Sequence, residues 1–258
     1  MLNSLYLIFI YISTAIALPT FFCCLEVLSF IVQNQSLDLW KTNCWVIIKI
    51  LLGTKQITLP GSNKIEKGFI LCNHRSIFDI PYDPYMMDAF TVGRTGACLF
   101  GNMASVLGIF SNRGLWFNRG STSRHKLMDM IINRLNSPNT KLKRVVFYPE
   151  GTRKKYRILW GKDDVKNIIK KGLIKSIYEH KKIPVQNYIS ANKEYPMSLM
   201  PFRAKPGITI ISKLGDPIYP DDFDTFDSFL DYICNDWFEL WYETHRHPKA
   251  IQRNSIVF

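Results

Sequence analysis

The sequence predicts an α/β fold, in which a mixed sheet is flanked by helices and preceded by an N-terminal membrane-embedded helix or helical hairpin. A long apolar segment opens the chain, short apolar runs typical of buried strands begin after Trp45, and segments with helical spacing separate these runs. No internal repeat or low-complexity linker divides the chain. We therefore expect a membrane segment over residues 1–45 and an α/β domain over residues 46–258.

The N-terminal segment is apolar and long enough for a bilayer. Glu26 is the only charged residue among the first 32, and about 20 apolar residues cross a membrane as a helix. A cleaved secretory signal would normally begin with a basic patch, and none precedes this run. Pro19 is compatible with one span or with a re-entrant hairpin, and a buried hairpin of a soluble protein is the alternative. Lysines begin at Lys41, so the rest of the chain is expected on the cytosolic side.

Strands and helices alternate in the remaining sequence. Apolar runs predict strands over residues 69–72, 145–148, 184–189 and 208–211. Helical spacing predicts helices over residues 77–89, 121–135 and 165–178. This alternation predicts a sheet covered by helices on its faces.

A last helix is expected to begin near Asp221 or Asp222, because acidic residues favour helix N-termini. Six apolar residues then follow at helical spacing: Phe226, Phe229, Leu230, Ile233, Trp237 and Trp241. An amphipathic membrane contact is one interpretation of this stripe. Packing against the domain is the commoner one, and it is the one we predict.

The composition favours anionic partners. Lys and Arg total 33 against 21 Asp and Glu, a formal charge of +12, which suits phospholipid head groups, phosphorylated metabolites or nucleic acid. The six cysteines form no Cys-x-x-Cys pair, so neither a zinc nor a disulfide framework is expected. Cys72 is predicted to be a buried strand cysteine. His245 and His247 form a His-x-His pair near the C-terminus, and no metal site is expected there.

The first candidate for chemistry is the segment from Asn73 to Asp79. Five positions separate His74 from Asp79, a spacing that a strand-to-helix turn can fold back on itself. The carboxylate would then accept a hydrogen bond from one imidazole nitrogen and leave the other to take a proton. This is the orienting half of a catalytic triad without a protein nucleophile. A helix start with a chance histidine is the alternative.

Two further segments carry arginines at strand ends. Residues 147–153, Phe-Tyr-Pro-Glu-Gly-Thr-Arg, run from an apolar strand into a turn. Gly151 there permits close approach of the backbone to a ligand, and Arg153 offers a planar donor fork suited to phosphate. Residues 114–120 present Arg119 after a short apolar strand. For residues 147–153, a turn with a surface arginine is the alternative interpretation. Residues 114–120 taken alone are only weak evidence for a binding site.

In this order the segments resemble those of the glycerophospholipid acyltransferases, specifically the 1-acylglycerol-3-phosphate (lysophosphatidic acid) acyltransferases. That family carries Asn-His-x4-Asp, Gly-x-x-Phe-x-x-Arg and Pro-Glu-Gly-Thr-Arg blocks and a later apolar block around a proline. Pro184 and Lys193 match the fourth block, whereas Ala191 and Glu194 replace its arginine and glycine. The resemblance runs from about residue 40 to residue 245.

The resemblance implies transfer of a fatty acyl group from acyl-CoA to the sn-2 hydroxyl of 1-acyl-glycerol-3-phosphate, without an acyl-enzyme intermediate. It implies no metal and no cofactor beyond acyl-CoA as co-substrate. His74 would be the general base and Asp79 its orienting partner. Glu150 would either bond the acceptor or hold Arg153, and we favour the second role. The implied substrate-binding residues are Asn73, Arg119, Glu150, Gly151, Thr152, Arg153, Pro184 and Lys193.

The implied partners are membrane phospholipid, a lysophospholipid acceptor and the acyl-CoA donor, at an endoplasmic-reticulum-like membrane if the protein is eukaryotic. Another lysophospholipid or glycerol 3-phosphate is the alternative acceptor, and a CoA-independent transacylase is a further alternative. A non-catalytic membrane protein that binds anionic lipid would explain the charge but not the pairing of His74 with Asp79. Nucleic-acid binding ranks last, because the basic residues are scattered and no zinc or aromatic RNA-binding signature is present.

Overall fold

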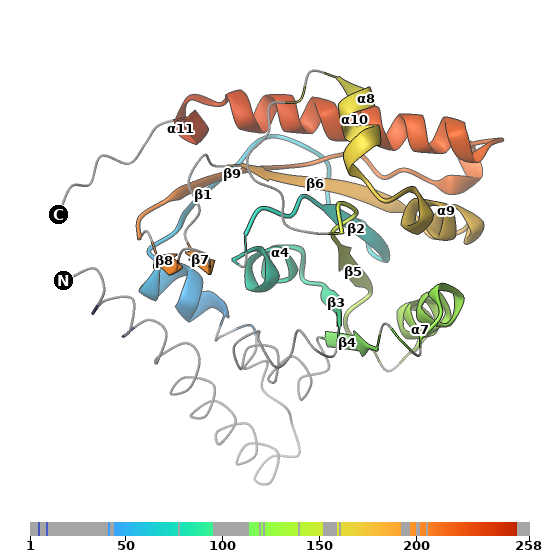
Figure 1. Ribbon diagram of the computed structural model, residues 1–258, viewed down its shortest axis with the longest axis horizontal. Coiled ribbons are helices and arrows are strands. Elements are labelled where there is room, and N and C mark those ends of the chain that lie inside the picture. Colours follow the sequence, from blue (N-terminus) through green and yellow to red (C-terminus); the bar gives the residue numbers. More distant parts are fainter. Residues whose placement is uncertain are drawn as a thin grey trace, which may run out of the picture.

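The fold is taken from a computed structural model, and Figure 1 shows a sheet with helices packed on both of its faces. The structure describes residues 44–76, 78–94, 114–118, 120, 122–138, 140–151, 159, 161–191, 197–199, 202–204 and 206–251, together with Leu5, Phe9 and Lys41.

The sheet is mixed, as the sequence predicts. Its order is β1-β9-β6-β2-β5-β3-β4, and every neighbouring pair is parallel except β6 with β9. The strands are β1 (Lys55–Thr58), β2 (Gly68–Cys72), β3 (Phe90–Arg94), β4 (Gly114–Phe117), β5 (Arg144–Phe147), β6 (Val185–Ala191) and β9 (Thr209–Leu214). A separate antiparallel pair joins β7 (Met197–Leu199) to β8 (Phe202–Ala204).

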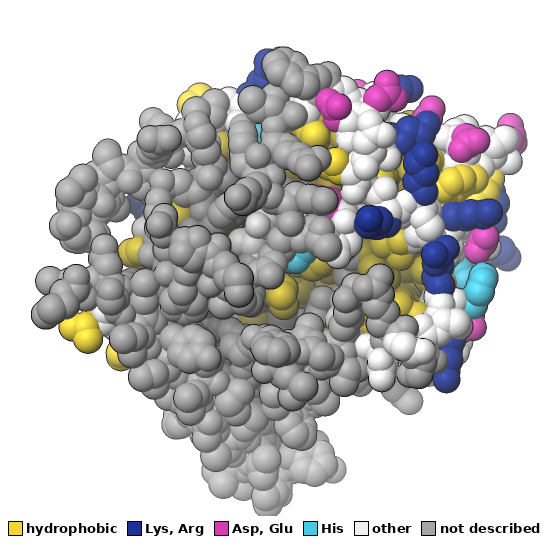
Figure 2. All heavy atoms as spheres, viewed as in Figure 1, with side chains coloured by type: hydrophobic (Ala, Val, Ile, Leu, Met, Phe, Trp, Pro, Cys, Tyr) yellow, Lys and Arg dark blue, Asp and Glu magenta, His cyan; other side chains and the backbone are white. Residues whose placement is uncertain are grey.

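The predicted helix over residues 165–178 is two helices, α8 (Lys162–Ile168) and α9 (Lys171–Glu179). The chain is extended at Ile169, and the backbone N–H of Lys170 donates to the carbonyl of Pro149 at 2.7 Å. This amide therefore bonds to the loop after β5, and the helix is interrupted. Figure 2 shows Lys and Arg side chains gathered on the right of the molecule, where Figure 1 places α9 and α7 (Arg124–Asn136).

Alternating residues of β2 enter two different cores. Phe69 and Leu71 lie in the main cluster, whereas Ile70 and Cys72 pack in a second cluster with Met87. All five β2 residues are buried because helices cover both faces of the sheet. The burial of Cys72 confirms its predicted placement in a strand.

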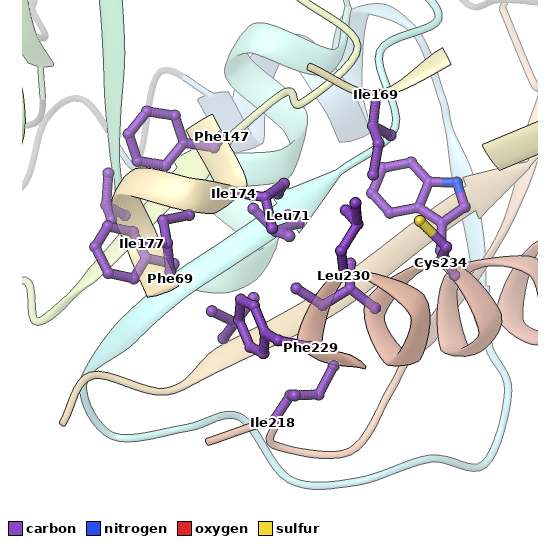
Figure 3. Close-up of a cluster of buried hydrophobic side chains, with 14 of the residues drawn as sticks. Phe69, Leu71, Phe147, Ile169, Ile174, Ile177, Ile218, Phe229, Leu230 and Cys234 are labelled. Atoms are coloured by element: carbon purple, nitrogen blue, oxygen red, sulfur yellow. The ribbon is translucent and has the colours of Figure 1, made fainter. Parts of the chain in front are cut away.

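The long helix α10 (Phe226–Arg246) covers one face of β6 and β9. Figure 3 shows Phe229 and Leu230 of this helix in the same cluster as Phe69 and Leu71. The predicted packing of this stripe on the domain is therefore confirmed. Phe226 is partly buried, and the other five residues are buried in the main core: Phe229, Leu230, Ile233, Trp237 and Trp241.

The predicted start of this helix near Asp221 is wrong by several residues. Pro220–Asp222 form only a 3-10 turn, and Phe223 is extended. The hydroxyl oxygen of Thr225 accepts the N–H of Ser228 at 3.2 Å, so Thr225 is the N-cap. A hydroxyl in this position satisfies a free amide of the first turn.

On the opposite face, α4 (Asp79–Met87) packs against β5 and β3. It begins two residues later and ends two residues earlier than the prediction over 77–89. Its C-terminal neighbour Asp88 adopts a left-handed conformation that ends the helix. The remaining elements are η2 (Val46–Leu51), η3 (Pro220–Asp222) and α11 (Pro248–Ile251).

The predicted membrane segment over residues 1–45 lies outside the described residues, except for five positions: Leu5, Phe9, Lys41, Cys44 and Trp45. Within the part of the chain that the structure describes, none of the helices combines the length and apolarity needed for a membrane span.

We expect Trp237→Ala to destabilise the domain by about 3–5 kcal/mol, because this ring is fully buried in the main core and its loss leaves a cavity. Tyr232→Ala, on the exposed side of the same helix, should cost less than about 1 kcal/mol. Denaturant unfolding of both variants compares the two costs. Equal destabilisation would contradict the packing of α10 on the sheet.

Candidate active site

Segments that are distant in the sequence meet at the carboxyl ends of three central strands. β2 lies between β5 and β6 and is parallel to both. The residues that follow the strands therefore gather at one edge of the sheet, where ligands commonly bind in α/β proteins. His74 follows β2, Tyr148 and Glu150 follow β5, and Ser190 lies near the end of β6.

The His74 imidazole and the Asp79 carboxylate form the predicted pair. Nδ1 of His74 lies 3.2 Å from Oδ2 of Asp79. The Asp79 side chain is fully buried, whereas 14% of the His74 side chain is exposed. The carboxylate also accepts the backbone N–H groups of Arg75 and Ser76, the second at 2.7 Å. One buried group thus closes the turn and orients an accessible imidazole.

Arg75 keeps Asp79 ionised. Nη2 of Arg75 lies 3.1 Å from Oδ1 of Asp79, and both side chains are buried. Burial alone would raise the pKa of Asp79, but the Arg75 guanidinium, the His74 ring and the Ser76 amide together lower it below its usual value. Asp79 is therefore a carboxylate at neutral pH.

Two residues after β5 hold His74 from other directions. Oε1 of Glu150 accepts the backbone N–H of His74 at 3.0 Å. The Tyr148 ring stacks on the imidazole with centroids 4.3 Å apart and an interplanar angle of 26°. The Tyr148 hydroxyl donates to the carbonyl of Asp79 at 2.8 Å, and burial raises its pKa well above the usual value, so it remains a donor. His74 therefore has little freedom to reorient.

Asn73 joins two strand ends. Its Nδ2 donates to the carbonyl of Ser190 at 2.9 Å, and its Oδ1 accepts the Ser190 N–H at 2.9 Å. Both polar atoms of the side chain thus bond to backbone, and the residue is buried. The predicted contact of Asn73 with substrate stays a prediction, and the geometry gives this residue a structural role.

The other predicted site residues are placed differently. Gly151 follows Glu150 in the turn, with a φ of +72° that favours glycine. Pro184 precedes β6 and accepts the N–H of Phe69 at 3.0 Å, so it lies at the end of the sheet away from His74. The remaining four lie outside the described residues, and their roles stay predictions: Arg119, Thr152, Arg153 and Lys193.

The sequence reasoning missed three residues beside the pair, namely Arg75, Tyr148 and Asp83. Asp83 lies one helical turn after Asp79 and is fully buried. The nearby Tyr148 hydroxyl is a neighbour of its carboxyl group that only partly offsets the effect of burial on the pKa. Burial and the Asp79 charge raise the pKa of Asp83 well above the usual value, which favours the protonated form of its carboxyl. The four-residue spacing of two acidic residues on a helix was the available signal.

We expect Asp83→Asn to gain stability relative to wild type as the pH rises above about 4, the usual pKa of an aspartate. A raised pKa means that the folded protein binds a proton that the unfolded chain has released, so wild type loses stability over this range. Asparagine does not titrate and therefore avoids this loss.

Denaturant unfolding at several pH values measures the difference. Asp231→Asn is the control, and its stability relative to wild type should change with pH in the opposite direction. The reason is that the hydrogen bond from Lys166 lowers the pKa of Asp231. Identical pH dependence in wild type and Asp83→Asn would show that Asp83 is ionised in the fold.

Comparisons with known proteins show the fold and the family of the chain. The structure is similar to the crystal structure of the 1-acyl-sn-glycerophosphate (LPA) acyltransferase PlsC from Thermotoga maritima, with a TM-score of 0.65 and 16% identity over 96% of each chain. At this identity the similarity establishes a shared fold. No curated protein sequence matches the chain. Residues 56–220, more than half of the chain and including His74, Asp79 and Glu150, match the family model named Acyltransferase. The chain therefore belongs to the acyltransferase family.

Proposed function

We propose that the protein is an acyl-CoA-dependent O-acyltransferase that acylates the sn-2 hydroxyl of 1-acyl-glycerol-3-phosphate and so forms phosphatidic acid. The observation that carries the proposal is the accessible His74 imidazole, whose Nδ1 lies 3.2 Å from the buried Asp79 carboxylate. Membership of the acyltransferase family supports acyl transfer. The blocks around His74 and Glu150 and the shared fold with an LPA acyltransferase support the acceptor.

The chemistry follows from the orientation of the ring. With its Nδ1 proton donated to Asp79, His74 has an unprotonated Nε2 that can accept a proton. Nε2 takes the hydroxyl proton as the alcohol oxygen attacks the thioester carbonyl. The C–S bond then breaks, and the imidazolium returns the proton to the CoA thiolate. Asp79 stabilises the imidazolium throughout.

The acceptor phosphate needs cations that fix its position. Arg119 and Arg153 are the proposed clamps, because a guanidinium offers bidentate, charge-assisted hydrogen bonds to phosphate. Glu150 accepts the backbone N–H of His74, which favours a role in holding the turn over a direct contact with the acceptor. Lys193 is a weaker candidate for a substrate contact, whereas Pro184 lies at the opposite end of the sheet from His74.

The proposed setting is a membrane, with the α/β domain on the cytosolic side. The apolar N-terminal residues and the formal charge of +12 favour this placement. The membrane would supply the lysophospholipid acceptor and receive the product.

We expect His74→Ala to lower the rate of acyl transfer by about 10²–10⁴-fold, because proton removal from the alcohol is lost. Release of free CoA thiol from acyl-CoA, in the presence of 1-acyl-glycerol-3-phosphate, measures this rate. His180→Ala, at the end of α9, is the matched histidine control and should retain activity. Near-wild-type turnover of a folded His74→Ala protein would refute the assignment of the base.

Arg153→Ala should raise the KM for 1-acyl-glycerol-3-phosphate by about tenfold or more, as expected for the loss of a charged hydrogen bond. Steady-state kinetics with this acceptor and with monoacylglycerol, which has no phosphate, test the role. The variant should leave the monoacylglycerol reaction unaffected. An unchanged KM for the phosphorylated acceptor would exclude Arg153 as a clamp.

A further inference from the structure

The side chain of Lys170 lies across the turn that contains Glu150. A Cβ atom added to Gly151 would be 3.3 Å from both Cγ and Cε of Lys170. The methylene groups therefore pack over a position that has no side chain of its own. The backbone N–H of Lys170 donates to Pro149 at 2.7 Å, so both its backbone and its side chain are held against this turn.

A second cation lies against the beginning of α9. A Cβ atom added to Gly172 would be 2.8 Å from Nη1 and 3.1 Å from Nη2 of Arg124. Gly172 is only two positions after Lys170. Two glycines thus allow two cationic side chains to lie close to the backbone, beside the loop between α8 and α9.

Lys170 and Arg124 differ from neighbouring lysines in their ion pairing. Lys162 and Lys166 both pair with the Asp231 carboxylate. Lys170 and Arg124 are exposed, and within the described part of the chain neither makes an ion pair. Figure 2 shows Lys and Arg side chains, with Asp and Glu side chains among them, on the side of the molecule where Figure 1 places α9 and α7. Two exposed cations without an ion pair among the described residues attract an anionic group.

We propose that Lys170 and Arg124 form a phosphate-binding subsite of the acyltransferase, additional to the arginines of the sequence blocks. The lysine would supply a point charge and the arginine a planar donor fork, a combination suited to phosphate oxygens. Glu150, adjacent to Gly151, bonds the backbone of His74. A phosphate held by Lys170 would therefore be fixed to the same turn that positions the general base.

Two substrate groups share this chemistry, namely the phosphates of CoA and the phosphomonoester of the acceptor. The inference rests on the proposed function, in which both are substrates. Lys170→Ala and Arg124→Ala should each raise the KM of the substrate whose phosphate is bound by about tenfold. Lys170→Arg should restore most of the loss. The exposed Lys175 lies on α9, so Lys175→Ala is the matched control and should leave both KM values unchanged.

Kinetics with acyl-CoA, with 3′-dephospho-acyl-CoA and with 1-acyl-glycerol-3-phosphate distinguish the sources. A KM increase for acyl-CoA that is absent with the dephospho analogue assigns the subsite to the 3′-phosphate, and an equal increase with both donors assigns it to the diphosphate. An increase for the lysophospholipid alone assigns it to the acceptor. Unchanged KM values for every substrate in both alanine variants would overturn the inference.

Calorimetric titration of the full chain with CoA and with glycerol 3-phosphate gives a readout that does not need turnover. Wild type should bind one of these probes about tenfold more tightly than Lys170→Ala. Equal affinities, or no binding of either probe by wild type, would overturn the subsite. Absence of acyl transfer by wild type, with phosphate binding that depends on Lys170, would instead reject the proposed function and retain the subsite.

Discussion

The buried carboxylate of Asp79 is the acceptor on which the turn between β2 and α4 depends. It receives the His74 imidazole, the Arg75 guanidinium and the backbone N–H groups of Arg75 and Ser76. Removing it would leave the Arg75 charge buried without this partner, a loss that typically costs about 3–5 kcal/mol. The same group therefore folds the turn and sets the orientation of the imidazole.

The order of the strands then decides what surrounds that imidazole. β5 lies beside β2 although Arg144, where β5 begins, follows Cys72 by 72 positions in the chain. This neighbour brings the Tyr148 ring onto the face of His74 and the Glu150 carboxylate to its backbone. On the other side β6 supplies the backbone that Asn73 bonds. A reactive side chain on a loop is thus held by the ends of three strands.

Charge is distributed unevenly around this edge of the sheet. The first turns of α4 carry two buried acids: Arg75 pairs with Asp79, whereas burial and the Asp79 charge raise the pKa of Asp83 well above its usual value. Outside, the loop before α9 presents Lys170 over Gly151 without an acidic partner among the described residues. The buried Asp79 carboxylate orients the His74 imidazole, and the exposed cations suit the phosphates of the proposed substrates.

The central strands and the His74–Asp79 pair could be predicted from the amino-acid sequence alone. The strands are buried on both faces and so appear as apolar runs, and the pair spans five positions and needs only a local turn. β1 and β3 are partly exposed and carry no such run. Tertiary structure alone decided the stacking of Tyr148, the burial of Asp83 and the break before Lys170. These features depend on which strands are neighbours, and local periodicity carries no information about contacts between segments that are distant in the sequence.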